Sequence, residues 1–182
     1  MDVDIAKRFE QYKSALVAWD PIKGGKEAFV CFKDSLISGL EEDPNGECFE
    51  AIANRMMAGN YYPPDAVEFF GLHQDEHRDM RPGDRILQRA PLFAGLYVWS
   101  MVEIYVAEKR ENYCRIGYVT TKKHHGRGIW TATVTRNEDD ELEIKVESIA
   151  SPNTFLFWIG LPVARYLQLR ARRRGIENLS QI

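Results

Sequence analysis

Three runs in the second half of the chain have the pattern of β-strands, and they constrain the fold most strongly. They are residues 98–107, 129–136 and 141–150. The first and the third alternate between two kinds of residue, as strand side chains do on the two faces of a sheet, and the second is rich in β-branched residues. Turn-length segments at residues 108–112 and 137–140 are short enough for hairpins. We therefore expect an antiparallel meander, with a further strand near residues 85–89.

Near both ends of the chain, apolar residues recur at steps of three and four, which predicts amphipathic helices. In the N-terminal part these are residues 4–19, 26–40 and 47–57. The last helix should begin at Ser151-Pro152, a cap followed by proline, and end at Gly175. Gly160 and Pro162 should kink it. Its expected buried stripe is Phe155, Ile159, Val163, Tyr166 and Leu167.

The composition argues against several classes of protein. With 182 residues, 45% of them apolar, the chain can form one domain with a substantial core. Its net charge of −3 and pI near 5.9 offer no general attraction to nucleic acid, so we expect no nucleic-acid partner. Three widely spaced cysteines and an N-terminus without a signal pattern predict a cytoplasmic protein. No apolar run approaches the ~18 residues of a membrane span, so no transmembrane segment is expected.

Residues 114–128 concentrate polar and titratable side chains on one predicted strand and the tight turn after it. Tyr118 and Thr120 share one face of that strand, whereas Arg115 lies on the other. If the first two face inward, their hydroxyls can orient a ligand. His124 at the strand's end can then act as acid, base or donor, because its ordinary pKa is about 6.5. A histidine here can equally cap the turn through backbone groups. The pattern predicts the polar wall of a pocket.

The same stretch resembles the uncharacterised family named domain of unknown function nineteen-ninety. That family's signature is tyrosine-glycine-threonine-leucine, two residues, histidine, and then arginine-glycine. Serine-x-proline and a glycine-proline-x-x-arginine-x-x-glutamine helix follow downstream. The residues at matching positions are Tyr118, Thr120, His124, Arg127, Gly128, Ser151, Pro152, Gly160, Pro162, Arg165 and Gln168. Val119 and Thr121 replace the glycine and the leucine, and Ile129-Trp130 stand where the family tends to carry acidic residues.

The resemblance covers residues 46–176 and implies a fold, but it brings no known reaction. Residues 1–45 would be an N-terminal helical extension, and residues 177–182 a tail. Helices, then a meander, then one long C-terminal helix is the order of the helix-grip fold of START and Bet v-like proteins. In that fold a curved antiparallel sheet wraps the terminal helix and leaves a cavity. We therefore expect an α+β helix-grip protein with additional N-terminal helices.

Our leading hypothesis is that an apolar or aromatic small molecule binds between the sheet and the C-terminal helix. A few polar groups in an otherwise apolar cavity is the usual composition of such sites. The expected lining is Trp99, Tyr118, Thr120, Trp130, Phe157 and Tyr166, with His124 and Arg115 at the polar end. No acid–base pair or nucleophilic triad can be recognised. We therefore expect binding without turnover, with neither a cofactor nor a metal ion.

Three alternatives stay open. A cyclase or hydrolase could use His124 as its acid or base. An adaptor could bind a protein or membrane surface through the N-terminal helices and the arginine-rich end of the C-terminal helix, although cations also suit that pole of a helix. His73, Glu76 and His77 match the inverted zincin motif, in which two histidines one helical turn apart bind zinc and glutamate is the base. Glu103 could be a buried acid or an ordinary residue at a sheet edge.

Overall fold

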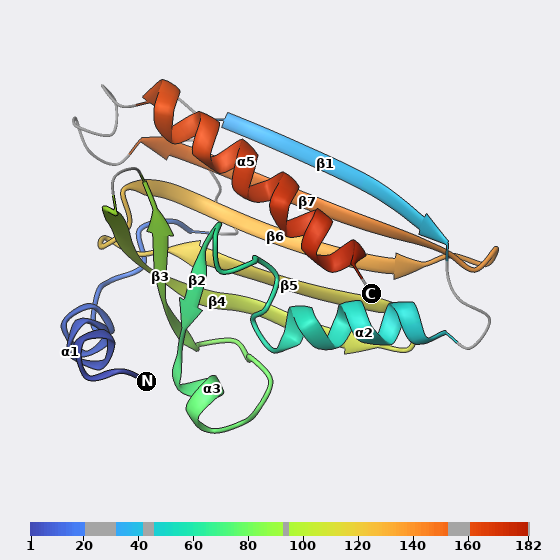
Figure 1. Cartoon of the computed structure of the whole chain (residues 1–182), viewed down its shortest axis with the longest axis horizontal. Helices are drawn as coiled ribbons and strands as arrows, with labels where there is room; N and C mark the ends of the chain where they lie inside the picture. Colours follow the sequence, from blue (N-terminus) through green and yellow to red (C-terminus); the bar gives the residue numbers. More distant parts are fainter. Residues whose placement is uncertain (21–31, 42–45, 93–94, 153–160, 182) are drawn as a thin grey trace.

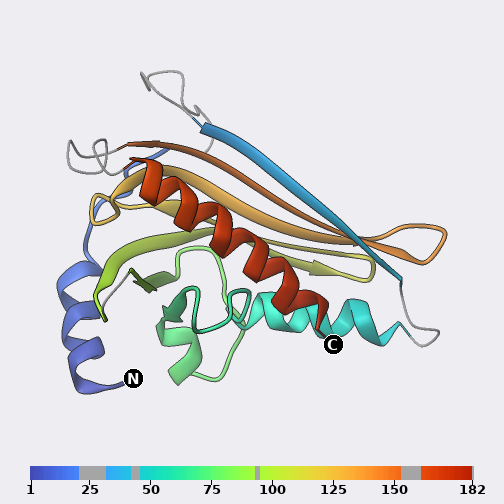
Figure 2. The same cartoon turned by 45° about the horizontal axis from the view of Figure 1, so that its top comes forward.

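The structure is a computed structural model that describes residues 1–20, 32–41, 46–92, 95–152 and 161–181. Its strands are β1 (Phe32–Glu41), β2 (Glu68–Phe70), β3 (Arg85–Pro91), β4 (Tyr97–Arg110), β5 (Tyr113–Thr120), β6 (Gly126–Arg136) and β7 (Glu141–Pro152). Its helices are α1 (Val3–Tyr12), α2 (Glu47–Met57), α3 (Leu72–Asp75) and α5 (Leu161–Ser180). The strands form one curved sheet, and α5 lies across one of its faces (Figures 1 and 2).

The sheet is an antiparallel meander for most of its width, as the sequence predicts. Its strand order is β1-β7-β6-β5-β4-β3-β2, so each strand from β2 to β7 lies beside its neighbour in the chain. The four predicted strand regions fall within β3, β4, β6 and β7, and α2 has the predicted limits. The α+β helix-grip fold is therefore confirmed.

The prediction of a helix at residues 26–40 is wrong for the part that the structure describes, because residues 32–41 form the edge strand β1. This strand pairs with β7 from Phe32, opposite Ala150, to Glu41, opposite Glu141. Its side chains alternate between more and less exposed, as expected for a strand covered on one face. The N-terminal 45 residues thus supply a strand of the sheet as well as helix α1. The domain boundary at residue 45 stays a prediction.

Two hydrophobic clusters cover opposite faces of the sheet. Ile86 lies opposite Val102, and both belong to the main core, which includes side chains of α2 and the end of α5. The next pair, Leu87 opposite Met101, packs against Phe9 of α1. Successive residues of a strand point to opposite faces. Helix α1 therefore covers the face that α2 and α5 do not.

Helix α1 ends at Tyr12, before the predicted limit at residue 19. Beyond it, Val17 forms a β-bridge with Thr121, and the Ala18 N–H donates to the carbonyl oxygen of Thr120 at 2.8 Å. The end of the predicted helix is therefore extended backbone that runs beside the end of β5.

Helix α5 continues to Ser180 through Gly175, the predicted end. A Cβ atom on Gly175 would lie far closer than 3.0 Å to the ring of Tyr61, so this glycine is a packing position. Tyr61 is buried, and its hydroxyl donates to the carbonyl oxygen of Arg172 at 3.5 Å. The predicted first turns of the helix, at residues 153–160, lie outside the described residues. In the ranges that the structure describes, no helix is both long and apolar enough to cross a membrane.

Candidate functional site

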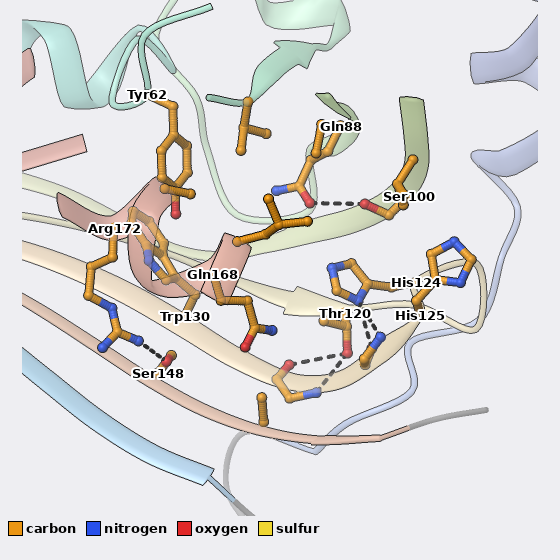
Figure 3. Close-up of a pocket in the computed structure, with 18 of the residues that line it drawn as sticks. Tyr62, Gln88, Ser100, Thr120, His124, His125, Trp130, Ser148, Gln168 and Arg172 are labelled. Atoms are coloured by element: carbon orange, nitrogen blue, oxygen red, sulfur yellow. Dashed lines mark hydrogen bonds between the residues drawn. The ribbon is translucent and has the colours of Figure 1, made fainter. Parts of the chain in front are cut away.

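A cavity of about 470 Å³ lies between the sheet and α5 (Figure 3). Its walls come from β3 to β7, from α5 and from the segment that follows α2, and they are mainly apolar. A volume of this size lies within the range of small-molecule sites, roughly 300–1,000 Å³. Polar side chains at its wall include Tyr62, Gln88, Ser100, Thr120, His124, Ser148, Gln168 and Arg172.

One wall of the cavity is aromatic. Tyr118 and Trp130 lie opposite each other on β5 and β6, and their rings stack with centroids 5.1 Å apart and an interplanar angle of 15°. The Tyr61 ring meets Trp130 edge-on at 4.7 Å, and Tyr62 meets Tyr61 edge-on at 4.5 Å. Such pairs contribute about 0.5–1.5 kcal/mol each beyond the area they bury. The result is an aromatic wall whose rings hold one another in place.

Gln88 and Ser100 bring a buried polar pair to the wall from β3 and β4. The Ser100 hydroxyl donates to the Gln88 side-chain oxygen at 3.1 Å. Burial raises the pKa of Tyr118, while hydrogen bonding with Gln88 and Tyr62 acts in the opposite direction. The Tyr118 phenol is therefore a neutral hydrogen-bonding group at pH 7.

Thr120 lines the cavity, but the sheet uses its hydroxyl. The Gly128 N–H donates to Thr120 Oγ1 at 2.8 Å, and Oγ1 can donate to the Gly128 carbonyl oxygen at 3.3 Å. Here β6 and β7 approach so closely that a Cβ atom on Gly128 would overlap the carbonyl oxygen of Ile149. The glycine of the arginine-glycine motif therefore has a structural explanation. Gly128 permits the close approach of β6 and β7, and the Thr120 hydroxyl hydrogen-bonds to its backbone.

His124 lies in the turn between β5 and β6, and its Nδ1 is bound to the backbone of Gly126. Nδ1 is 2.7 Å from the Gly126 carbonyl oxygen and 3.0 Å from the Gly126 nitrogen, so its tautomer decides whether it donates or accepts. Burial lowers the pKa of His124 to about 4. The imidazole is therefore neutral at pH 7, and a group with this pKa is a weak proton acceptor.

The lowered pKa of His124 predicts how stability depends on pH. An unfolded histidine has a pKa of about 6.5, so between that pH and about 4 the unfolded chain binds more protons than the folded chain. The free energy of unfolding therefore decreases as the pH falls from about 6.5 to about 4, by at most about 1.4 kcal/mol per pH unit. Above pH 6.5 this contribution is fully present. Urea unfolding at pH 7, 6 and 5 should show a shallower pH slope for His124→Gln. An identical slope in both proteins would contradict the lowered pKa.

Three of the residues predicted to line the cavity lie elsewhere. Trp99 is on the face covered by α1, where the Arg89 guanidinium lies 5.6 Å from its ring. Arg115 alternates with core residues of β5 and lines a second cavity of about 370 Å³ on that same outer face. Tyr166 is 65% exposed on α5. These three predictions are wrong because the sequence does not show which face of an element meets the cavity, and Phe157 lies outside the described residues.

The zinc interpretation of His73, Glu76 and His77 is wrong. Helix α3 ends at Asp75, and His77 has a left-handed backbone with φ of 51°, so the two histidines do not share a helical turn. His73 is buried, whereas His77 is exposed, and Glu76 pairs with Arg78 at 2.5 Å. Within the described residues, no group of three or more histidine, cysteine, aspartate or glutamate side chains could hold a metal ion.

Glu103 is a half-buried structural residue. It pairs with Arg85 across β3 and β4 at 2.7 Å. It alternates with Val102 and Ile104 of the main core, so it lies on the face away from the cavity. It therefore supplies no acid or base to the cavity.

Sequence reasoning missed a charged group on the inner side of α5. Arg172 is 6% exposed; its Nη2 donates to Ser148 Oγ at 2.5 Å and lies 3.7 Å from the Asp34 carboxylate. Arg165, two turns earlier, holds the same carboxylate through both terminal nitrogens, and this lowers the pKa of Asp34. Spacing is the signal that could have found this group, because Arg165, Gln168 and Arg172 recur at steps of three and four and so share a helix face.

Comparisons with solved structures find similar folds at low sequence identity. A hypothetical protein from Helicobacter pylori has a TM-score of 0.56 and 12% identity, covering 90% of this chain and 94% of that chain. A Thermus thermophilus protein has a TM-score of 0.53 and 11% identity, covering 82% and 95%. Norcoclaurine synthase from Thalictrum flavum, in complex with dopamine and hydroxybenzaldehyde, has a TM-score of 0.53 and 12% identity, covering 91% and 93%. At these identities the likeness concerns the fold alone.

Comparison with sequences gives a family. No curated protein sequence matches this chain. Residues 42–178 match the model of the family described as Domain of unknown function (DUF1990). This match spans most of the 182 residues and includes the strand, turn and helix that carry the sequence motif. The chain therefore belongs to the DUF1990 family.

Proposed function

We propose that this protein binds a small apolar or aromatic molecule in the cavity between the sheet and α5, without transforming it. The observation that carries the proposal is the cavity of about 470 Å³ beside the stacked rings of Tyr118 and Trp130. A mainly apolar cavity with a few placed polar groups is the usual composition of small-molecule sites. Aromatic side chains already held by packing lose little freedom when a ligand ring lies against them.

Binding without turnover is supported by the protonation states at the cavity wall. His124, with its pKa of about 4, is a weak base, and Tyr118, with its raised pKa, is a weak acid. Neither exchanges a proton readily near pH 7.

The Thalictrum flavum norcoclaurine synthase structure holds dopamine and hydroxybenzaldehyde. Both are small aromatic molecules, which supports this ligand class here.

The arginine-rich end of α5 supports small-molecule binding over an adaptor role. Arg165 and Arg172 share the carboxylate of Asp34, and Arg174 pairs with Asp65 at 2.9 Å. Three of the five arginines on this part of α5 thus have an acidic partner within the chain, whereas Arg170 and Arg173 are exposed. A partner phosphate would have to compete with these contacts at Arg165, Arg172 and Arg174. We therefore propose that the protein has no nucleic-acid or membrane-surface partner. We also propose that it is cytoplasmic.

Native mass spectrometry of the full chain, purified from its own host, tests the proposed function. We expect a mass excess that corresponds to one small molecule and that disappears when the protein is denatured. A uniform mass equal to that of the chain alone, in protein purified without dialysis, would count against it.

Filling the cavity from α5 should weaken ligand binding. Ala171 lines the cavity, so Ala171→Trp places an indole where the ligand would lie. We expect affinity for the co-purified molecule to fall at least about tenfold, which corresponds to about 1.4 kcal/mol. Leu169→Trp is the matched control, because it adds the same side chain at an exposed position of the same helix. A folded Ala171→Trp protein that retains the molecule would show that it binds elsewhere.

A further inference from the structure

The cavity wall contains a buried cation that apolar binding leaves unexplained. Arg172 is 6% exposed, and charged side chains are rarely buried to this degree unless they are paired. Its acidic neighbour Asp34 forms only a long ion pair with it, at 3.7 Å, and Arg165 already binds both oxygens of that carboxylate. Two guanidinium groups therefore share one carboxylate. The net charge of this group of three side chains is +1.

The Arg172 guanidinium also has donors that no described residue uses. A guanidinium carries five N–H groups. Nη2 donates to Ser148, whereas Nε and Nη1 have no hydrogen-bond partner in the described part of the chain. Ser148 is directly opposite Trp130 in the pairing of β6 with β7, and such neighbours have Cβ atoms roughly 5 Å apart. Figure 3 shows the Arg172 guanidinium beside Ser148, at the end of the cavity where Trp130 lies.

The other charges at the cavity wall do not neutralise Arg172. Among the described residues that line the cavity, the acidic one is Asp65, and it pairs with Arg174. The lining also includes two further cations, Arg127 and Arg170. Burial raises the pKa of the nearby phenols Tyr62 and Tyr118, and the charge of Arg172 is among the influences that oppose this. The positive field of this side chain thus reaches the surface on which the ligand ring would lie.

We propose that the ligand is an anion, a small aromatic or apolar carboxylate, which accepts hydrogen bonds from Arg172 while its ring lies against Tyr118 and Trp130. This inference rests on the proposed function and narrows its ligand class. A carboxylate oxygen can accept from an N–H of the guanidinium that Ser148 does not use, and hydrogen bonds between charged partners are roughly twice as strong as neutral ones. Gln168, one turn before Arg172, also lines the cavity and brings a second polar side chain to it (Figure 3).

Two probes of the same shape test this in the full chain: 2-naphthoate, which is anionic at pH 7, and neutral 2-naphthamide. By isothermal titration calorimetry, we expect naphthoate to bind at least about tenfold more tightly than naphthamide. Arg172→Gln should reduce this preference to about twofold or less. Arg172→Lys, which keeps the charge but not the planar guanidinium, should keep part of it. Arg173→Gln, at an exposed position of α5, should leave the preference unchanged.

The outcomes separate the two proposals. If the wild-type protein binds both probes equally, the anion inference is overturned and the cavity still binds aromatic molecules. If neither probe binds at millimolar concentration and no molecule co-purifies, the proposed function is overturned and the inference with it. The wild-type comparison decides the anion question even if Arg172→Gln does not fold.

Discussion

Gly128→Ala is expected to lower the free energy of unfolding by about 3 kcal/mol, through one added methyl group. The new Cβ atom would overlap the carbonyl oxygen of Ile149 and the Cα atom of Ala150. Both atoms belong to the backbone of β7, which cannot rotate aside as a side chain can. The pairing of Gly128 with Ala150 would have to open, and with it the hydrogen bonds that Thr120 makes to Gly128. Thermal unfolding should show a midpoint lower by roughly 6–12 °C.

Gly39→Ala provides the matched control. Gly39 lies in β1, and a Cβ atom there would meet no atom within 4 Å. Alanine also restricts the unfolded chain more than glycine does, so we expect stability to be unchanged or to rise by up to about 1 kcal/mol. Equal losses in the two variants would mean that glycine is not required for the close approach of β6 and β7.

The meander could be predicted because its strands are long, alternate clearly and are joined by short turns. β1 could not be predicted, because Phe32, Leu36 and Leu40 are spaced by four residues. Four residues are about one helical turn and also two strand periods, so local sequence fits both structures. Pairing with β7, more than a hundred residues later, decides the outcome. Gly175 is a similar case, since glycine can end a helix or permit the close packing that Tyr61 makes on α5.

Only some of the predicted residues line the cavity, because strand alternation separates the two faces of a sheet without saying which face is inside. Tyr118 and Trp130 line the cavity, whereas Trp99 packs with the cluster under α1. Gln88 reaches the cavity through the packing of β3 beside β4, and nothing in its local sequence distinguishes it. Arg172 belongs to a cluster of arginines near the C-terminal end of a helix, where cations are stabilised by the helix dipole, so the sequence does not single it out. Only the position of α5 against β7 shows that this member of the run is buried.

Asp34→Asn is expected to change stability and ligand affinity in opposite directions. The substitution removes the one negative charge that Arg165 and Arg172 share, and Arg172 is then a buried cation without a counter-charge. Because Asp34 and Arg165 are partly solvated, at 16% and 25% exposed, we expect a loss of about 2–4 kcal/mol. The same substitution leaves the Arg172 charge unopposed, so 2-naphthoate should bind about fivefold more tightly, while 2-naphthamide should be unaffected.

The pKa of Asp34 adds a second readout. Hydrogen bonding from Arg165 lowers this pKa, so the folded chain binds fewer protons than the unfolded chain as the pH approaches about 3.9. The stabilisation is present above that pH and is lost as the pH falls below it. Urea unfolding between pH 6 and pH 3 should therefore show that wild-type stability falls toward that of Asp34→Asn.

Glu50→Gln is the matched control for the loss of a paired carboxylate. Glu50 pairs with Lys109 at 2.6 Å, but its side chain is 53% exposed, and surface pairs of this kind contribute about 0–1 kcal/mol. Neither stability nor naphthoate affinity should change measurably in this variant. If folded Asp34→Asn binds naphthoate more weakly than the wild type, the ligand's carboxylate does not meet the unopposed charge of Arg172. A gain in naphthoate affinity confined to Asp34→Asn, alongside its loss of stability, would show that Asp34 holds this cation in place for folding and competes with the ligand for it.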